Sequence, residues 1–441
     1  MKLEDYRIAW KSPDDLRPYA RNARVHSKKQ IGQIAESIKR FGFTNPILVD
    51  EKSNVIAGHG RLAAALELGM AEVPTIKLSH LTEKERQAYI LADNKLAENA
   101  AWDNELLALE LSDLSELDFD LSLTGFSASE IDLVLDGFED ASTNSNVDEV
   151  DLIPEENGPT VTRLGDAWNL DRHTLVCGDA LVHQSYENLM AGKQADVIFT
   201  DPPYNVPIDG HVCGLGKVRH REFAMASGEM SQQEFTTFLE TSMQNAAACA
   251  KDGAIAFVCM DWRHIREVLD AGAVAFNELK NLCVWNKTNG GMGAFYRSKH
   301  ELIFVFKKGT ATHINNFGLG EHGRYRTNVW DYAGISSIGA HRDDELAMHP
   351  TVKPVAMIAD ALRDCSRRND IVLDPFGGSG STLVAAQITG RLARLIELDP
   401  AYCDTIIRRF AKLTGKQAIL TGSGETFEEV ALRRSGRGHD D

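Results

Sequence analysis

Long apolar runs and a secretory signal are both absent from this sequence. No stretch approaches the roughly 18 consecutive apolar residues that a membrane-spanning helix needs. The N-terminus, MKLEDYRIAWKSPDD, has neither the basic start nor the apolar core of a signal peptide. We therefore expect a cytoplasmic protein with no membrane partner. Its 441 residues exceed what one hydrophobic core usually supports, so we expect two domains.

Paired cysteines are also lacking. The seven cysteines are scattered and odd in number, and none forms a CxxC pair, which argues against a disulfide framework and against a zinc site. The histidines show no convincing ligand spacing either, so we expect no metal. Reduced, mostly buried thiols are the better interpretation of Cys177, Cys213, Cys249, Cys259, Cys283, Cys365 and Cys403.

The chain has no overall excess of basic residues, because its formal net charge is −17. One segment accounts for this value: residues 100–160 hold 17 of the 64 acidic residues and no Lys or Arg, which leaves 47 acidic and 47 basic residues elsewhere. Residues 279–330 contain eight Lys and Arg against Glu301 and Glu321, a net of +6. The global charge therefore does not exclude a nucleic-acid partner.

The first 100 residues are typical of a small α/β unit. Hydrophobic periodicity predicts helices over 30–42 and 60–69 and strands over 46–50, 55–58 and 73–78. Residues 101–140 form an acidic helical extension, which follows a helical pattern at 82–97. It includes a helix over 103–113 and a capping box, Ser127 to Glu130, ahead of the helix IDLVLDG. Polar residues 141–160 are predicted to be a linker.

From residue 161 to 441, strands and helices alternate, which indicates a parallel-type sheet covered on both faces. The helices are expected at 231–249, 355–366 and 380–389. The strands are expected at 173–179, 195–201, 254–260, 279–285, 300–307, 370–376 and 391–399.

A glycine-rich turn links a strand to a helix in IVLDPFGGSGSTLVAAQ (371–387). Gly377, Gly378 and Gly380 allow a ligand to approach the backbone closely at the helix N-terminus. Glu397 ends the next strand, where its carboxylate can accept hydrogen bonds from two ribose hydroxyls. This pattern suits any nucleoside cofactor. Its position near the C-terminus requires that the other strands of the sheet come from upstream.

The strand VIFTDPPYN (197–205) ends directly in Asp201-Pro202-Pro203-Tyr204. The two prolines fix φ and remove N–H donors, so the loop is rigid. The Asp201 carboxylate and an unpaired backbone carbonyl can both accept from an amino group, and Tyr204 offers a stacking face. A planar base with an exocyclic amine fits all three, and stacking worth roughly 1–3 kcal/mol offsets part of the cost of extruding that base.

A third motif, MHPTVKP (348–354), precedes the helix that leads to the 371 strand. The order of the three motifs resembles that of the β-class DNA amino-methyltransferases over about 165–425. This resemblance implies an α/β, Rossmann-like S-adenosylmethionine-dependent methyltransferase fold with a mixed sheet and a permuted motif order. It implies S-adenosylmethionine as the cofactor and DNA as the substrate.

The resemblance also assigns residues. It implies that the cofactor is bound by Asp179, Thr351, Lys353, Asp374, Phe376, Gly377, Gly378, Gly380 and Glu397. The target base would lie against Asp201, Pro202, Pro203 and Tyr204. Adenine enzymes of the family usually begin this motif with Asp or Asn and cytosine-N4 enzymes with Ser. Asp201 therefore favours N6 of adenine, and N4 of cytosine stays the nearest alternative.

Two segments are candidates for DNA contact. Residues 206–230 follow the base motif and are rich in glycine and cations, and residues 279–330 hold the +6 patch. The predicted contacts are Lys217, Arg219, Arg221, Lys287, Arg297, Lys299, Arg324 and Arg326. The latter region is short for a self-contained recognition domain, so sequence selectivity is expected to be modest or shared with the first domain.

Residues 12–95 resemble the ParB/sulfiredoxin-like fold, on LRPYARNARVHS (16–27) and AGHGRLAAALELG (57–69). The second box implies a phosphate-facing turn, Gly58-His59-Gly60-Arg61, at a helix start, so Arg61 is a further candidate for DNA or phosphate contact. ParB nucleotide-binding proteins have Glu-Arg where this chain has His59-Gly60. This departure argues against nucleotide hydrolysis.

Two other classes of protein remain open at this point. A nucleotide-dependent oxidoreductase would explain the glycine turn and Glu397 but not the DPPY and HPTVKP motifs. A non-catalytic ParB-like DNA-binding regulator would not need intact Asp201, Tyr204 and Glu397. The sequence also leaves open whether the protein forms a homodimer, and whether it works in restriction-modification beside a restriction-enzyme partner.

Overall fold

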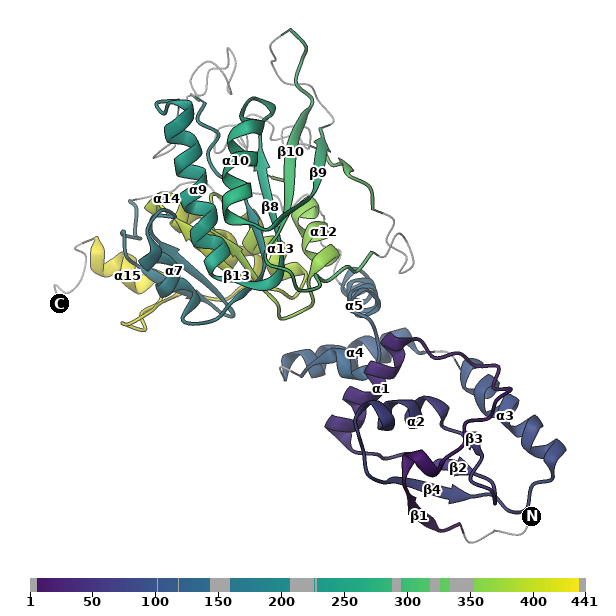
Figure 1. The fold of residues 1–441 in the computed structure, drawn as a ribbon. Coiled ribbons are helices and arrows are strands. Elements are labelled where there is room, and N and C mark those ends of the chain that lie inside the picture. The colour runs from purple at the N-terminus through teal and green to yellow at the C-terminus, as the bar shows by residue number, and fades with distance from the viewer. Residues whose placement is uncertain are drawn as a thin grey trace, which may run out of the picture. The chain divides into compact units, whose positions relative to one another are not determined.

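The computed structural model describes residues 6–100, 102–117, 119–142, 159–206, 226, 228–287, 295–317, 326–333 and 353–435 (Figure 1). Residue contacts divide the chain into two compact units, Met1–Phe138 and Glu139–Asp441. Most of the expected linker, 143–158, lies outside the described residues, as do the site candidates Lys217, Arg219, Arg221, Arg324 and Thr351.

The first unit begins with a four-stranded sheet of order β1-β4-β2-β3, in which β2 and β4 are parallel and the other pairs antiparallel. Its strands are β1 (Ile8–Lys11), β2 (Ile47–Val49), β3 (Val55–Ala57) and β4 (Val73–Lys77). Helices α1 (Lys28–Phe41) and α2 (His59–Glu67) pack together, after the 3-10 turn η1 (Pro13–Asp15). Ile47, Val49 and Val55 form a core with Leu62 of α2.

A helical segment with its own small core completes this unit. After α3 (Glu83–Glu98) it comprises α4 (Asn104–Glu116), the 3-10 turn η2 (Leu121–Thr124) and α5 (Ala128–Ser142). Leu107 and Leu111 of α4 pack against Ile131 and Leu135 of α5. The capping box expected at the start of α5 is confirmed: the backbone N of Ser127 donates to Glu130 Oε2 (2.7 Å) and the backbone N of Glu130 donates to Ser127 Oγ (3.3 Å).

The second unit is built on a ten-stranded sheet of order β11-β9-β10-β8-β7-β12-β13-β6-β5-β14. Five central strands, β8-β7-β12-β13-β6, are parallel, whereas β10, β5 and β14 each run antiparallel to their neighbours. The sheet is therefore mixed, as the methyltransferase resemblance implies, and not simply of the parallel type. Its strands are β5 (Ala167–Leu170), β6 (His173–Cys177), β7 (Ala195–Thr200), β8 (Ala250–Met260), β9 (Glu278–Asn286), β10 (His300–Lys307), β11 (Val329–Asp331), β12 (Ile371–Asp374), β13 (Leu392–Glu397) and β14 (Ile419–Leu420).

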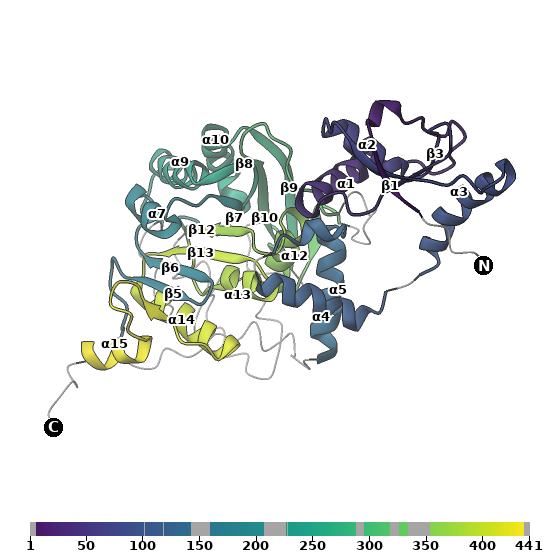
Figure 2. The same ribbon diagram turned by 90° about the horizontal axis from the view of Figure 1, so that it is seen from below.

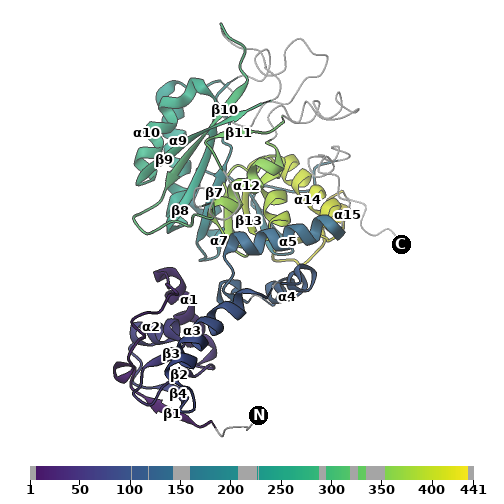
Figure 3. The same ribbon diagram turned by 90° about the vertical axis from the view of Figure 1, so that its right-hand side faces the viewer.

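Helices cover both faces of this sheet (Figures 2 and 3). Along β8, Ile255 and Phe257 belong to one hydrophobic core and Ala256 and Val258 to the other, because successive strand residues point to opposite faces. The first core packs under α12 (Val355–Cys365), α13 (Ser381–Ile388), α14 (Pro400–Thr414) and α15 (Phe427–Arg434). The second packs under α7 (His183–Met190), α9 (Gln232–Ala248) and α10 (Ile265–Ala275), which follows the 3-10 turn η3 (Trp262–His264).

The carboxyl ends of β6, β13, β12 and β7 meet at one edge of the sheet, since these strands are parallel neighbours. From β7 the chain continues outward to β8, and from β12 it continues the opposite way to β13. Such a reversal opens a crevice in which open α/β sheets bind ligands. The antiparallel strand β10 starts at this same edge, because Leu302 pairs with Met260 at the end of β8.

Candidate active site

The motif Asp201-Pro202-Pro203-Tyr204, which the resemblance predicts to bind the target base, forms a loop at the end of β7, called the target-base loop below. Pro202 is buried and Asp201 is partly buried, so the loop is packed into the unit. Asn205 fastens its far end: the side-chain amide donates to the backbone O of Met230 (2.8 Å) and accepts from the backbone N of Gly228 (3.1 Å) and of Met230 (3.2 Å). A rigid loop is what orienting a substrate amine requires.

Four charged side chains and one hydroxyl meet at this loop. Lys353 Nζ lies 2.5 Å from Asp201 Oδ2 and 3.2 Å from Glu301 Oε2. The Tyr204 hydroxyl lies within hydrogen-bond distance of the same two carboxylates, 2.8 Å from Asp201 Oδ1 and 3.2 Å from Glu301 Oε2. Lys287 Nζ donates to the other oxygen of Glu301. Two ammonium groups thus match two carboxylates.

The two carboxylates differ in their affinity for protons. Burial raises the pKa of Asp201, an effect that Lys353 opposes and the charge of Glu301 reinforces. Burial also acts to raise the pKa of Glu301, but Lys353 and Lys287 outweigh it and bring the value to about 2. Burial and the adjacent carboxylates raise the pKa of Tyr204. A proton entering the cluster is therefore held by Asp201, while Glu301 stays ionised.

The glycine-rich turn follows β12 and begins α13. Gly378 has φ of 51° and Gly380, the N-cap of α13, has φ of 86°, both in the left-handed region. Asp374 stabilises the turn through two hydrogen bonds. Its Oδ1 accepts from the backbone N of Phe376 (3.0 Å), and its Oδ2 accepts from the Thr382 hydroxyl (2.6 Å). Burial raises the pKa of Asp374 to about 8.

Glu397 ends β13 beside this turn. Its Oε2 accepts from the backbone N of Gly378 (2.7 Å) and its Oε1 from the backbone N of Asp399 (2.8 Å), so the carboxylate is oriented by the backbone. Each oxygen keeps a second lone pair for a hydroxyl donor. Burial raises the pKa of Glu397 to about 7, against the effect of these backbone hydrogen bonds. Asp179, after β6, accepts from the backbone N of Leu181 (2.8 Å).

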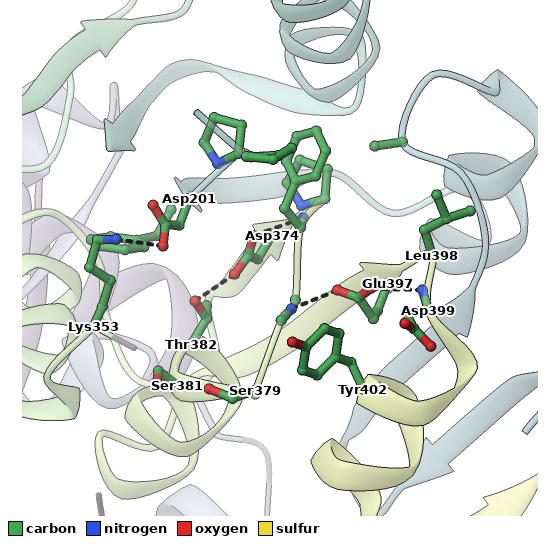
Figure 4. Close-up of a pocket in the computed structure, with 18 of the residues that line it drawn as sticks. Asp201, Lys353, Asp374, Ser379, Ser381, Thr382, Glu397, Leu398, Asp399 and Tyr402 are labelled. Carbon is green, nitrogen blue, oxygen red and sulfur yellow. Dashed lines mark hydrogen bonds and ion pairs between the residues drawn. The ribbon is translucent and has the colours of Figure 1, made fainter. Parts of the chain in front are cut away.

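The target-base loop and the glycine turn line one pocket of about 1170 Å³, its open mouth included. Figure 4 shows Asp201 and Lys353 on one side, Glu397, Asp399 and Tyr402 on the other, and Asp374 between them. All the described candidates for base and cofactor contact line it except Gly380, where an added Cβ would meet Ile406 of α14 instead. Sequence reasoning missed several lining residues, namely Gly178, Phe199, Ser379, Ser381, Thr382, Leu398, Asp399 and Tyr402.

Several predicted contacts have partners inside the protein. Lys353 donates to Asp201 and Glu301, and Lys287 belongs to the same cluster. Arg326, a predicted DNA contact, pairs with Asp360 and Asp364 and lies over the Trp330 ring, with 17% of its side chain exposed. The structure therefore favours a structural role for Arg326, because these partners already satisfy its charge.

Arg61 lies at the start of α2 in the first unit. Its guanidinium is partly buried and donates to the backbone O of Pro46 at a long 3.4 Å. Burial lowers the pKa of Arg61, against the effect of Asp93. Gly58, just before α2, has φ of 99°, and a Cβ there would come within 2.9 Å of the Arg61 guanidinium. The glycine thus lets the guanidinium fold back over the turn.

Within the described ranges, no group of three or more His, Cys, Asp and Glu side chains is arranged to hold a metal ion. In the same ranges, no helix is both long and apolar enough to cross a membrane.

Family models match three stretches of the chain. Residues 7–95 match the ParB N-terminal domain, 105–164 the ParB-methyltransferase HTH domain, and 195–408 the DNA methylase family that covers N6 and N4 enzymes. Residues 195–408 thus form an N6/N4 DNA methylase domain, and residues 7–95 form a ParB N-terminal domain that precedes it in the sequence. The protein's enzymatic class is that of a DNA methyltransferase.

Curated relatives match the two parts separately. The ParB-like nuclease domain-containing protein YnaK of Escherichia coli (strain K12) is 52% identical over 84 residues, 19% of this chain and 97% of that protein. The DNA adenine methyltransferase YhdJ of the same strain is 25% identical over 304 residues, 62% of this chain and 92% of that protein. The type II methyltransferase M.HinfI of Haemophilus influenzae is 25% identical over 242 residues, 50% of this chain and 64% of that protein.

Solved structures show more distant likeness. The complex of M1.HpyAVI with SAM is 21% identical, with a TM-score of 0.40, over 53% of this chain and 97% of that one. The cytosine-N4-specific PvuII DNA methyltransferase is 16% identical, with a TM-score of 0.41, over 61% of this chain and 94% of that one.

Proposed function

We propose that the protein transfers a methyl group from S-adenosylmethionine to the exocyclic N6 of adenine in DNA. The observation that supports this most directly is the single pocket lined by both the Asp201–Tyr204 loop and the glycine turn with Glu397. A base amine in one half of this pocket would lie beside a cofactor in the other half. The relative YhdJ, an adenine methyltransferase by name, also favours adenine over cytosine, as does Asp201 at the start of the motif.

The residues of the cofactor half suit S-adenosylmethionine. Asp179, Glu397 and Asp399 line that half, and carboxylates suit a cationic sulfonium and two ribose hydroxyls. The glycine turn leaves room for the ligand, since Gly377 and Gly378 both line the pocket and place no side chain in it. When bound, S-adenosylmethionine supplies the methyl group, which the base amine takes in a direct displacement.

The chain's own residues orient the amine. The N6 lone pair of adenine is delocalised into the ring and is weakly nucleophilic. Hydrogen bonds from the amine to Asp201 and to the Pro202 carbonyl favour a tetrahedral nitrogen with a localised lone pair. Asp201 then accepts the proton that the methylated nitrogen loses, consistent with the raised pKa of Asp201. Orientation and electrostatics supply the catalysis, without a covalent enzyme intermediate.

The target base is tested by digesting DNA from cells that express the protein and separating the nucleosides. We expect N6-methyldeoxyadenosine, absent when Tyr204→Ala is expressed, and sequencing the modified sites gives the recognition sequence. N4-methyldeoxycytidine in its place would overturn the assignment to adenine but would still support DNA methyltransferase activity.

Cofactor affinity is predicted to rise with pH. The form of Glu397 that accepts ribose hydroxyls is the carboxylate, and with a pKa of about 7 its ionised fraction increases about tenfold from pH 6 to pH 8. Isothermal titration with S-adenosylmethionine should therefore show about tenfold tighter binding at pH 8 and proton release at pH 7. Glu397→Gln should remove most of this dependence. Equal wild-type affinity at the two pH values contradicts the prediction.

An exposed aromatic pair in the segment between β9 and β10 is a further candidate for DNA contact. Phe295 and Tyr296 are 96% and 79% exposed, and they precede the cations Arg297 and Lys299 in the segment leading to Glu301. Exposed aromatics next to cations suit bases and phosphates. We expect the double variant Phe295→Ala, Tyr296→Ala to raise the KM for duplex DNA about tenfold, since base stacking is worth roughly 1–3 kcal/mol.

The matched control for this pair is Leu279→Ala. Leu279 is also an exposed apolar residue, but it lies at the start of β9, whereas the aromatic pair follows the end of that strand. Its KM for duplex DNA should match the wild type. If the aromatic variant keeps a normal KM on both duplex and single-stranded substrates, the pair does not contact DNA.

A further inference from the structure

Two residues outside the sequence motifs extend the charged cluster at the target-base loop: Glu301 contacts Tyr204, and Lys287 contacts Glu301. Glu301 stands second in β10, and its side chain is 11% exposed. Its Oε2 lies 3.2 Å from Lys353 Nζ and 3.2 Å from the Tyr204 hydroxyl, and its Oε1 accepts from Lys287 Nζ. Lys287 directly follows β9 and also lies over the Trp285 ring, 4.6 Å from its centroid. Both residues are therefore fixed in place.

Charges alternate along this chain of contacts, from Lys287 through Glu301 and Lys353 to Asp201. The formal charges of these four groups sum to zero. Without Glu301, the remaining three would sum to +1 at the place where methyl transfer puts positive charge on the base nitrogen. In a partly buried site such a charge is poorly screened and raises the energy of the cationic transition state.

We propose that Glu301 and Lys287 are positioning residues that hold Lys353 between two carboxylates and keep the target-base site electrically neutral during methyl transfer. The proposal rests on the proposed function. Asp201 is the catalytic residue that contacts the amine, and Glu301 acts on it through Lys353 and Tyr204. When the methylated nitrogen gives up its proton, the N–H electron pair stays on nitrogen and the new O–H bond forms at Asp201.

The pKa values of the two carboxylates are consistent with this division of roles. The pKa of Glu301 is lowered to about 2 and that of Asp201 is raised, so Glu301 stays charged when Asp201 takes the proton. The groups that face Asp201 are Lys353, Tyr204 and Glu301, together with Cys259 of β8 and Asp374 of β12. Since the charge of Glu301 raises the pKa of Asp201, its removal should lower that pKa.

The test is a double-mutant cycle on kcat with Glu301→Gln, Lys287→Met and their combination, using full-length protein and saturating DNA. We expect Glu301→Gln to lower kcat at least about tenfold. Removing Lys287 as well returns the formal charge of the site to zero, so the double variant should recover at least about threefold of that loss. A merely structural role predicts a double variant as slow as Glu301→Gln or slower, and that result would overturn the proposal.

The pH profile of kcat gives a second readout. Its acid limb should shift to lower pH in Glu301→Gln and to higher pH in Lys353→Met, because the two changes remove opposite influences on Asp201. Unshifted limbs in both variants contradict the proposal. Glu278→Gln and Lys280→Met, an ion pair at the far end of β9, serve as controls with expected wild-type kcat. S-adenosylhomocysteine binding verifies folding of every variant, and a wild type that methylates no DNA refutes the proposed function instead.

Discussion

Asp201→Asn should reduce methyl transfer by about 10³-fold or more, with cofactor binding retained. The substitution keeps the shape of the side chain but removes its charge, so Lys353 loses a partner 2.5 Å away. It also replaces one carboxylate oxygen by an amide donor, which cannot accept from the base amine or take its proton. The cofactor half of the pocket, from Asp374 to Glu397, keeps its contacts.

Two measurements check this expectation. Single-turnover transfer of labelled methyl groups to DNA gives the rate, and titration with S-adenosylhomocysteine gives the affinity for the cofactor product. Asp261→Asn is the matched control, because Asp261 follows the neighbouring strand β8 just as Asp201 follows β7, and it caps a 3-10 turn by accepting from Arg263 N (3.0 Å). Turnover by Asp201→Asn within tenfold of the wild type would remove Asp201 from the mechanism.

Much of the pocket could be predicted from the sequence because its parts lie at strand ends. The runs before Asp201, Asp374 and Glu397 are apolar and end in turn residues, so each could be placed at the carboxyl edge of a parallel sheet. The strands expected at 195–201, 370–376 and 391–399 are confirmed as β7, β12 and β13, each slightly shorter than expected. Hydrophobic periodicity and turn residues are local properties of the sequence, so they locate the end of each strand. The carboxyl ends of parallel neighbouring strands lie at the same edge of the sheet, so the residues that follow them come together there.

The charged cluster could not be predicted in this way. Glu301 reaches Tyr204 only because β10 runs antiparallel between β8 and β9, which brings the start of β10 to the carboxyl edge. The hydrophobic pattern of an apolar strand is the same whether the strand runs parallel or antiparallel to its neighbours. The sequence around Glu301 therefore does not show which way β10 runs in the sheet. For the same reason the sequence predicts Lys287 and Arg326 as DNA contacts, whereas the structure pairs both with carboxylates of the same unit.

Gly380→Val is expected to destabilise the methyltransferase unit by about 2–4 kcal/mol and to weaken cofactor binding at least about tenfold. At φ of 86° a side chain is strained, and a Cβ would lie 3.1 Å from Cγ1 of Ile406, which is fully buried in α14. Ile406 cannot yield without disturbing the core, so the turn must shift. Such a shift pulls the backbone N of Gly378 away from Glu397, whose orientation depends on that hydrogen bond.

Gly415→Ala is the control that separates backbone strain from the clash. Gly415 ends α14 with φ of 70°, and an added Cβ there would meet no heavy atom within 4 Å. The Gly415→Ala variant should melt at a slightly lower temperature than the wild type and bind S-adenosylhomocysteine with unchanged affinity. Gly380→Val should lose both stability and affinity, and the smaller Gly380→Ala should lie between the two. If Gly380→Val binds the ligand normally, close packing of the turn against Ile406 does not determine the shape of the cofactor pocket.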